Sequence, residues 1–192
     1  MLFHSETERR SLLELARRAI SEAVSHEKLA QAIPRGGVFD EKRGAFVTLQ
    51  VRGRLRGCIG NVEAFEPLGQ AVARCAVNAG LHDPRFSPVS TEDLRELQIE
   101  ISLLSSLEPI LPDSIEVGKH GLLVTQGTKR GLLLPQVAVE HKLAREQFLE
   151  ETCRKAGLPA NAWLESETRI YGFVCEVFAE NGNDRSEAVP NA

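Results

Sequence analysis

Apolar residues recur at helical spacing in three stretches of the chain. The first, residues 5–25, opens with Ser5 followed three residues later by Glu8, the pattern of a capping box, and then carries leucine or alanine every three or four positions. The second stretch starts at Leu68, and the third covers residues 145–156. Three longer amphipathic helices are therefore predicted, and each of the last two is expected to end at a glycine, Gly80 and Gly157.

Alternation of apolar and polar residues predicts about six strands. They cover residues 45–51, 55–60, 97–105, 120–126, 130–135 and 168–178. Most of them follow one another across short turns, as in hairpins, and no regular βαβ series appears. Strands and helices in this irregular order indicate an α+β fold with a mainly antiparallel sheet.

The first predicted hairpin determines which side chains share a face of the sheet. If residues 52–54 form a three-residue turn, the buried face holds three pairs: Val51 with Leu55, Leu49 with Gly57, and Val47 with Ile59. The opposite face then holds Thr48, Gln50, Arg54, Arg56 and Cys58, with Gln50 across from Arg56 and Thr48 across from Cys58. A polar stripe is expected around the thiol.

The composition is that of a soluble globular protein. Of the 192 residues, 42% are hydrophobic and 26% are charged, and this length fits one domain with a substantial core. We expect that domain to cover residues 1–179. Residues 180–192 contain few apolar side chains, so a mobile tail is expected there.

Charge and hydropathy exclude several classes of function. The net charge of −4 argues against a broad basic surface for nucleic acid or for an anionic membrane. No apolar run approaches the roughly 18 residues of a membrane span, and the first twenty residues lack the apolar core of a signal peptide. A cytoplasmic location with four free thiols is therefore expected. The cysteine spacing fits no metal site, and no motif identifies a cofactor.

Cys58 is the residue around which chemistry can be argued. A cysteine reacts as its thiolate, which a nearby cation stabilises, and Arg56 lies two residues away on the same predicted strand face. Gly57 and Gly60 lack Cβ atoms, so a ligand or another backbone can approach the strand closely. The segment can therefore hold a nucleophile.

A base for this thiol has two candidates, His82 and His120, each where a loop meets a predicted element. His82 is followed by Asp83, which either orients the imidazole or stabilises the turn before Pro84. Arg85 either clamps an anion or braces the loop.

Structural interpretations compete with these roles. Free cysteines are among the most buried residue types, so packing is the commoner role for a strand cysteine. Arg54 and Arg56 either bind a phosphate or carboxylate group or keep a hairpin tip soluble. The other three cysteines are assigned to the core, and His4 is assigned to the surface.

Residues 55–60, "LRGCIG", with "FVTL" before them and "DPRFSPV" after them, resemble the hallmark of the AMMECR domain family. Further segments resemble the family in the same order: "ISLLSSLEPI", "VGKHGLLV", "LLLPQVA" and "FLEETCRKAGLP". The resemblance covers residues 13–178. A short chain of this kind is similar to the bacterial and archaeal members called AmmeMemoRadiSam system protein A.

The resemblance implies a compact α+β unit with a larger and a smaller lobe and places the hallmark motif near the cleft between them. It favours His120 over His82 as a base, because His82 matches no family position. It also implies two partners, a Memo-like protein and a radical SAM enzyme encoded beside it, and it implies no defined activity. The matching site positions are Leu55, Arg56, Gly57, Cys58, Ile59, Gly60, Asp83, Arg85, Phe86, His120 and Gly121.

Two functions of different classes follow. In the first, the chain is an accessory component that presents its hairpin and cleft to a partner protein, a peptide or a small anion, and the radical SAM enzyme performs the chemistry. The binding residues would be Arg54, Gly57, Gly60, Thr48, Asp83 and Arg85. In the second, the chain is an enzyme in which Cys58 reacts as a thiolate, Arg56 stabilises charge and His120 supplies acid or base. The first is preferred, because a lone thiol is a narrow basis for naming a reaction.

Overall fold

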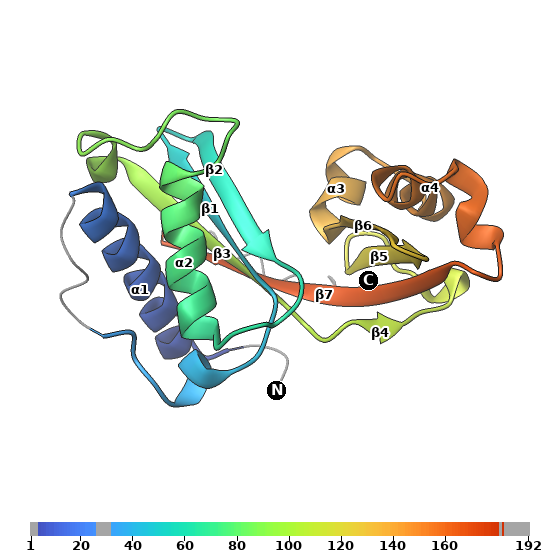
Figure 1. Ribbon diagram of the computed structural model, residues 1–192, viewed down its shortest axis with the longest axis horizontal. Coiled ribbons are helices and arrows are strands. Elements are labelled where there is room, and N and C mark those ends of the chain that lie inside the picture. The colour runs from blue at the N-terminus through green and yellow to red at the C-terminus, as the bar shows by residue number, and fades with distance from the viewer. Residues whose placement is uncertain (1–3, 26–31, 181, 183–192) are drawn as a thin grey trace. The chain divides into compact units, whose positions relative to one another are not determined.

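The computed structural model describes residues 4–25, 32–180 and 182. These residues form helices and antiparallel strands (Figure 1), which confirms the predicted α+β class with a mainly antiparallel sheet. They divide into two compact units. Unit 1 contains the described residues up to Leu104 and those from Glu176 onward, and unit 2 contains Ser105–Cys175. The predicted tail, 180–192, lies almost entirely outside the described residues.

Unit 1 packs two helices against one face of a sheet (Figure 1). In chain order it contains α1 (Glu6–Val24), the 3-10 turn η1 (Gly37–Asp40), β1 (Ala45–Val51), β2 (Arg54–Asn61), α2 (Leu68–Leu81), η2 (Asp93–Arg95), β3 (Leu97–Leu104) and the end of β7 (Arg169–Ala179). The capping box at the start of α1 is present as predicted. The alternate apolar residues of β1 and β3 are buried against these helices, so the polar residues between them lie on the other face.

The first hairpin is confirmed, but its predicted three-residue turn is wrong. Arg52 and Gly53 alone form the turn, with φ of 52° and 72°, the two positive values that a type I′ turn requires. Gln50 therefore pairs with Leu55, one residue earlier than expected, and a bulge absorbs the extra residue of β2. Because of this shift Leu55 is 44% exposed instead of buried. Beyond the bulge the predicted pairs are present: Leu49 with Gly57, Thr48 with Cys58, and Val47 with Ile59.

Unit 2 surrounds a second core that includes Leu122 and Phe148. It contains β4 (Glu108–Pro109), the 3-10 turn η3 (Pro112–Ser114), β5 (His120–Gln126), β6 (Lys129–Leu133), α3 (Pro135–Glu140), α4 (Arg145–Lys155), the 3-10 turn η4 (Ala160–Leu164) and most of β7. The short helix α3 was not predicted from the sequence, because six residues show too little periodicity.

The described strands hydrogen-bond in the order β2-β1-β3-β7-β5-β6, and β4 pairs with β7 outside this path. β2 is therefore an edge strand. Within the described ranges, no helix is both long enough and apolar enough to cross a bilayer.

Two single-residue predictions are wrong. Gly80 does not end α2, which continues to Leu81; instead it allows the close approach of α1, because a Cβ there would lie 2.3 Å from Ile20 Cδ1. His4 is not on the surface: it is 9% exposed and bonded to Glu176 of β7.

Candidate functional site

The two glycines of residues 55–60 are required by close packing. A Cβ on Gly57 would lie 1.8 Å from the carbonyl oxygen of Ala79, so α2 can pack on β2 only where no side chain intervenes. A Cβ on Gly60 would lie 2.3 Å from Cγ of Phe46, the residue with which it pairs on β1. Both glycines therefore have an architectural role.

Arg56 braces a loop. Its guanidinium donates hydrogen bonds to the carbonyl oxygens of Ser87 and Pro88, the second at 3.2 Å, and lies 3.6 Å from Asp93. Arg56 is the extra residue of the bulge in β2, and its side chain has this orientation there. Arg56 thus has several partners in the segment after α2, and this geometry supports its structural interpretation.

Two side chains form hydrogen bonds to the backbone of Cys58 on the edge of β2 that does not pair with β1. Its N–H donates to Asp83 Oδ2 at 2.9 Å, and its carbonyl oxygen accepts from Arg85 Nη2 at 3.1 Å. On an edge strand these groups would otherwise be open to another strand. The loop after α2 therefore closes the edge of β2 at Cys58.

Asp83 and Arg85 form a bidentate pair. Arg85 Nε donates to Oδ1 at 2.9 Å and Nη2 donates to Oδ2 at 2.7 Å, while the Arg85 backbone N–H also donates to Oδ1. These hydrogen bonds, with the one from Cys58, hold the pKa of the buried Asp83 carboxyl far below its usual range, and Asp83 in turn raises the pKa of Arg85. The guanidinium also lies 5.3 Å from the centroid of the Phe86 ring.

Arg85 is the cation best placed to bind a ligand beside Cys58. Its side chain is 55% exposed even though Asp83 and Phe86 fix its orientation. A guanidinium held this way can offer its remaining N–H groups to a carboxylate or phosphate with little loss of side-chain entropy.

The thiol of Cys58 is half-buried and accepts a hydrogen bond from Thr48 Oγ1 at 3.3 Å. The other three cysteines are buried, as predicted, and burial raises the pKa of Cys75 and of Cys153. Cys58 is therefore the cysteine most open to reaction.

Glu100 belongs to the same row of the sheet and was missed by the sequence reasoning. Thr48 pairs with Cys58 on one side and with Glu100 on the other. Residues paired this way share a face, so thiol, hydroxyl and carboxylate follow one another across β2, β1 and β3. The signal that could have found Glu100 is the matching alternation of residues 45–51 and 97–103, which are paired throughout.

The structure brings some of the predicted site residues together. Thr48, Cys58, Asp83 and Arg85 form one cluster in unit 1, whereas Arg54 is exposed near the hairpin turn. Gly57 and Gly60 lie on either side of Cys58 in the chain, and both serve close packing.

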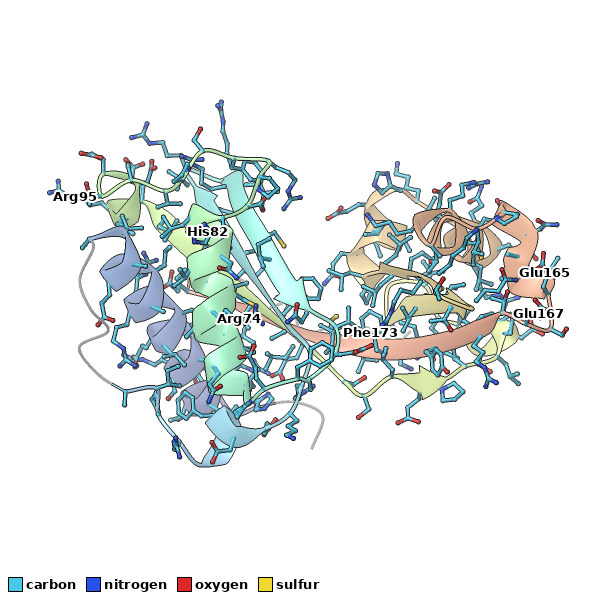
Figure 2. All side chains as sticks on the ribbon, in the orientation of Figure 1. Arg74, His82, Arg95, Glu165, Glu167 and Phe173 are labelled. Atoms are coloured by element: carbon cyan, nitrogen blue, oxygen red, sulfur yellow. The ribbon has the colours of Figure 1, made fainter. Side chains whose placement is uncertain are left out.

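The two candidate bases, His82 and His120, belong to different units. His82 is exposed at the C-terminal end of α2 (Figure 2). His120 begins β5 in unit 2, where its Nδ1 accepts a hydrogen bond from the Glu116 backbone N–H at 3.0 Å, and burial lowers its pKa. No described residue set with three or more His, Cys, Asp or Glu side chains has the geometry to hold a metal ion.

Comparisons with known proteins agree on the family. The AMMECR1 family model matches residues 13–178. A protein of Methanothermobacter thermautotrophicus is 44% identical over 188 residues, covering 93% of this chain and 97% of its own length, and one of Methanosarcina acetivorans is 42% identical over 186 residues, with 92% and 93% covered.

A solved structure is also similar over nearly the whole chain. The crystal structure of the uncharacterized protein PH0010 from Pyrococcus horikoshii matches with a TM-score of 0.83 and 40% identity, covering 93% of this chain and 94% of that one. With the family match over residues 13–178, these similarities place the present chain in the AMMECR1 family.

Proposed function

We propose that this protein is a binding component that recognises an anionic group on a partner or ligand at the face around Cys58, and that it acts with a Memo-like protein and a radical SAM enzyme. The pairing with these partners rests on the family resemblance of the sequence. The binding role rests on the site.

One observation carries the binding role: the exposed guanidinium of Arg85 is fixed by the buried Asp83 beside Cys58. Arginine at a surface usually forms weak, mobile contacts. Here the Asp83 carboxylate, whose pKa is strongly lowered, holds Arg85 in place. The Arg85 side chain is therefore already ordered in the folded protein, and ligand binding does not have to lose that side-chain entropy. Such a cation suits recognition of a carboxylate or phosphate.

The test is a binding measurement with a purified Memo-like protein and a purified radical SAM enzyme from the same organism. We expect a complex with at least one of them, and Arg85→Gln should weaken it at least tenfold. Arg85→Lys should weaken it nearly as much, because lysine cannot form the bidentate pair with Asp83 that holds the cation in place. Arg95→Gln, which changes an exposed arginine of η2 (Figure 2), is the matched control and should bind normally. Equal affinity for the Arg85 and Arg95 variants would refute the proposal.

A second function is favoured by the hydrogen bond from Thr48 to the Cys58 sulfur. In this alternative Cys58 attacks an electrophilic substrate as a thiolate. Cys58→Ser would then abolish the activity of the assembled system while leaving its assembly intact. Retained activity in that variant would exclude covalent catalysis by Cys58.

A further inference from the structure

The outer edge of β2 presents four backbone groups at Cys58 and Gly60. In an antiparallel pair, a residue directs both its N–H and its C=O either toward the partner strand or away from it, and this direction alternates along the strand. The Cys58 groups point away from β1, because they bond to Asp83 and Arg85. Gly60 lies two residues further along the regular part of the β1–β2 pairing and therefore has the same orientation. The order along this edge is the Cys58 N–H, the Cys58 C=O, the Gly60 N–H and the Gly60 C=O.

Side chains occupy three of these four groups. The first two are bonded by Asp83 and Arg85. With the Asn61 amide oriented to satisfy both of its neighbours, its nitrogen donates to the Gly60 oxygen at 2.9 Å and its oxygen accepts from Arg74 Nη2 at 2.7 Å. Within the part of the chain that the structure describes, the Gly60 N–H has no acceptor, and Gly60 is only half-buried. This edge is therefore closed to another strand but keeps one free donor.

The guanidinium of Arg85 supplies further donors at the same place. It has five N–H groups. Asp83 accepts from Nε and from Nη2, and the Cys58 carbonyl oxygen also accepts from Nη2. The two N–H groups of Nη1 have no acceptor among the described residues, and the Arg85 side chain is 55% exposed. Because the Gly60 N–H is the next group on the edge after the Cys58 oxygen, the free donors of Arg85 lie beside the free donor of Gly60.

The charge at this place suits a ligand with a single negative charge. Asp83 is ionised, since its pKa is far below the usual range, so Asp83 and Arg85 together are neutral. The Asp83 carboxylate and the Cys58 carbonyl oxygen would repel a dianion such as a phosphate more strongly than a monoanion. A carboxylate brings one charge and two oxygens, which match one donor group on each of Gly60 and Arg85.

We propose that the Gly60 N–H and Nη1 of Arg85 together bind a carboxylate, with one carboxylate oxygen on each donor. Carboxylate binding here rests on the proposed binding role of Arg85 and narrows its ligand from an anion to a carboxylate. Gly60 then serves recognition as well as packing, because its missing side chain leaves room for the Phe46 ring while its N–H faces the ligand. A free small acid and an acidic group of a partner protein both have this chemistry.

The experiment is nitrogen–proton NMR of the full chain, titrated with sodium acetate at pH 7.5. Methyl phosphate, which is mainly a dianion at this pH, is the second probe. Sodium chloride at equal ionic strength controls for screening. The signals followed are the Gly60 backbone N–H and the Arg85 Nε–H. Arg85→Gln removes the guanidinium, and Arg95→Gln in η2 is the matched control.

We expect acetate to shift the Gly60 proton downfield in a saturable way, because the N–H gains an acceptor. The shift should fall at least fivefold in Arg85→Gln and persist in Arg95→Gln. Methyl phosphate should need at least a threefold higher concentration for the same shift, and equal affinity for the two probes would overturn the assignment to a carboxylate. If Arg85→Gln fails to fold, the Gly60 and Arg85 signals of the wild type decide.

Failure of this site and failure of the proposed function give different results. Movement of the Arg85 signal with an unmoved Gly60 proton would overturn the paired site and leave Arg85 as an anion-binding residue. No movement of either signal would also overturn the site, whereas the proposed function is decided by the binding measurement with the partner proteins.

A titration of the partner-bound protein distinguishes the two sources of the carboxylate. Loss of acetate binding on addition of the partner identifies an acidic group of the partner as the ligand. Retained acetate binding identifies a separate small acid. Either result supports the site.

Discussion

Asp83 accepts the outward-pointing N–H of Cys58 at 2.9 Å, so a side chain takes the position that a neighbouring strand would occupy. Arg85 completes the arrangement by donating to the Cys58 carbonyl oxygen. The edge strand β2 is thereby closed to other strands at the one residue whose thiol faces away from the helices. Asp83 also holds Arg85, the cation proposed to bind a ligand, in a fixed orientation.

The edge closure by Asp83 predicts a loss of stability in Asp83→Asn. Asparagine has one acceptor oxygen in place of two and no charge for Arg85, so the variant should lose about 2 kcal/mol of unfolding free energy. Urea denaturation followed by circular dichroism at pH 7 measures this. Asp113→Asn is the control, because Asp113 pairs with Arg145 at a fully open position and should change stability by less than about 0.5 kcal/mol. Similar small losses in both variants would contradict the role of Asp83.

The approach of α2 to β2 predicts that Gly57→Ala is strongly destabilising. The new methyl group would meet the backbone of Ala79, which cannot move without shifting the helix, and the cost should be about 3 kcal/mol. Gly172→Ala in β7 is the comparison, since the three atoms nearest to a Cβ there belong to the Ile110 side chain, at 3.0 to 3.3 Å, and none is a backbone atom. That change should cost less than about 1 kcal/mol. The expected ranking is read from thermal unfolding, and its reversal would show that the contact is not rigid.

The hydroxyl of Thr48 predicts the reactivity of the thiol. Thr48→Val keeps the shape but cannot donate to the Cys58 sulfur, so the thiolate loses a hydrogen bond of about 1 kcal/mol and alkylation at a fixed pH should slow about fivefold. Thr48→Ser retains the hydroxyl and should react like the wild type. Rates are measured by mass spectrometry of the Cys58 peptide. An unchanged rate in Thr48→Val would show that the hydrogen bond does not stabilise the thiolate.

The environment of His120 predicts an acid-sensitive unit 2. Burial, followed by the charge of Lys119, lowers the pKa of His120, and the Glu116 N–H needs an unprotonated Nδ1. The folded unit therefore resists protonation, so its stability should be full above about pH 6.5 and fall as the pH decreases from there.

Fluorescence of Trp163, which packs against the core of unit 2, follows this unfolding. His120→Gln can still accept the Glu116 N–H and should flatten the pH profile between pH 5 and 7. The exposed His82 in unit 1 provides the control, His82→Gln, which should leave the profile as it is. Identical profiles for the wild type and His120→Gln would rule out this effect.

Local patterns in the sequence were sufficient for most of the fold. The three longer helices, the capping box at Ser5 and the pairing of Thr48 with Cys58 were predicted, because each depends on residues close together in the chain. The two-residue turn was missed because it needs a positive φ at Arg52, which a non-glycine residue seldom adopts.

Contacts between distant segments were the main gap in the sequence reasoning. The place of Glu100 beside Thr48 depends on the pairing of β3 with β1, and the burial of His4 depends on Glu176, 172 residues away. Asp83 and Arg85 were named as candidates, but their hydrogen bonds to Cys58 depend on where the loop after α2 crosses β2. None of these contacts between distant residues produces a repeating pattern of apolar and polar positions in the sequence.

The binding role of the face around Cys58 is tested most directly by the alkylation rate of each cysteine in the native protein, with and without the bound partner. We expect Cys58 to react much faster than Cys75, Cys153 and Cys175, and a saturating concentration of the partner to slow the alkylation of Cys58 at least tenfold. A partner that binds while Cys58 reacts at its original rate would contradict this role.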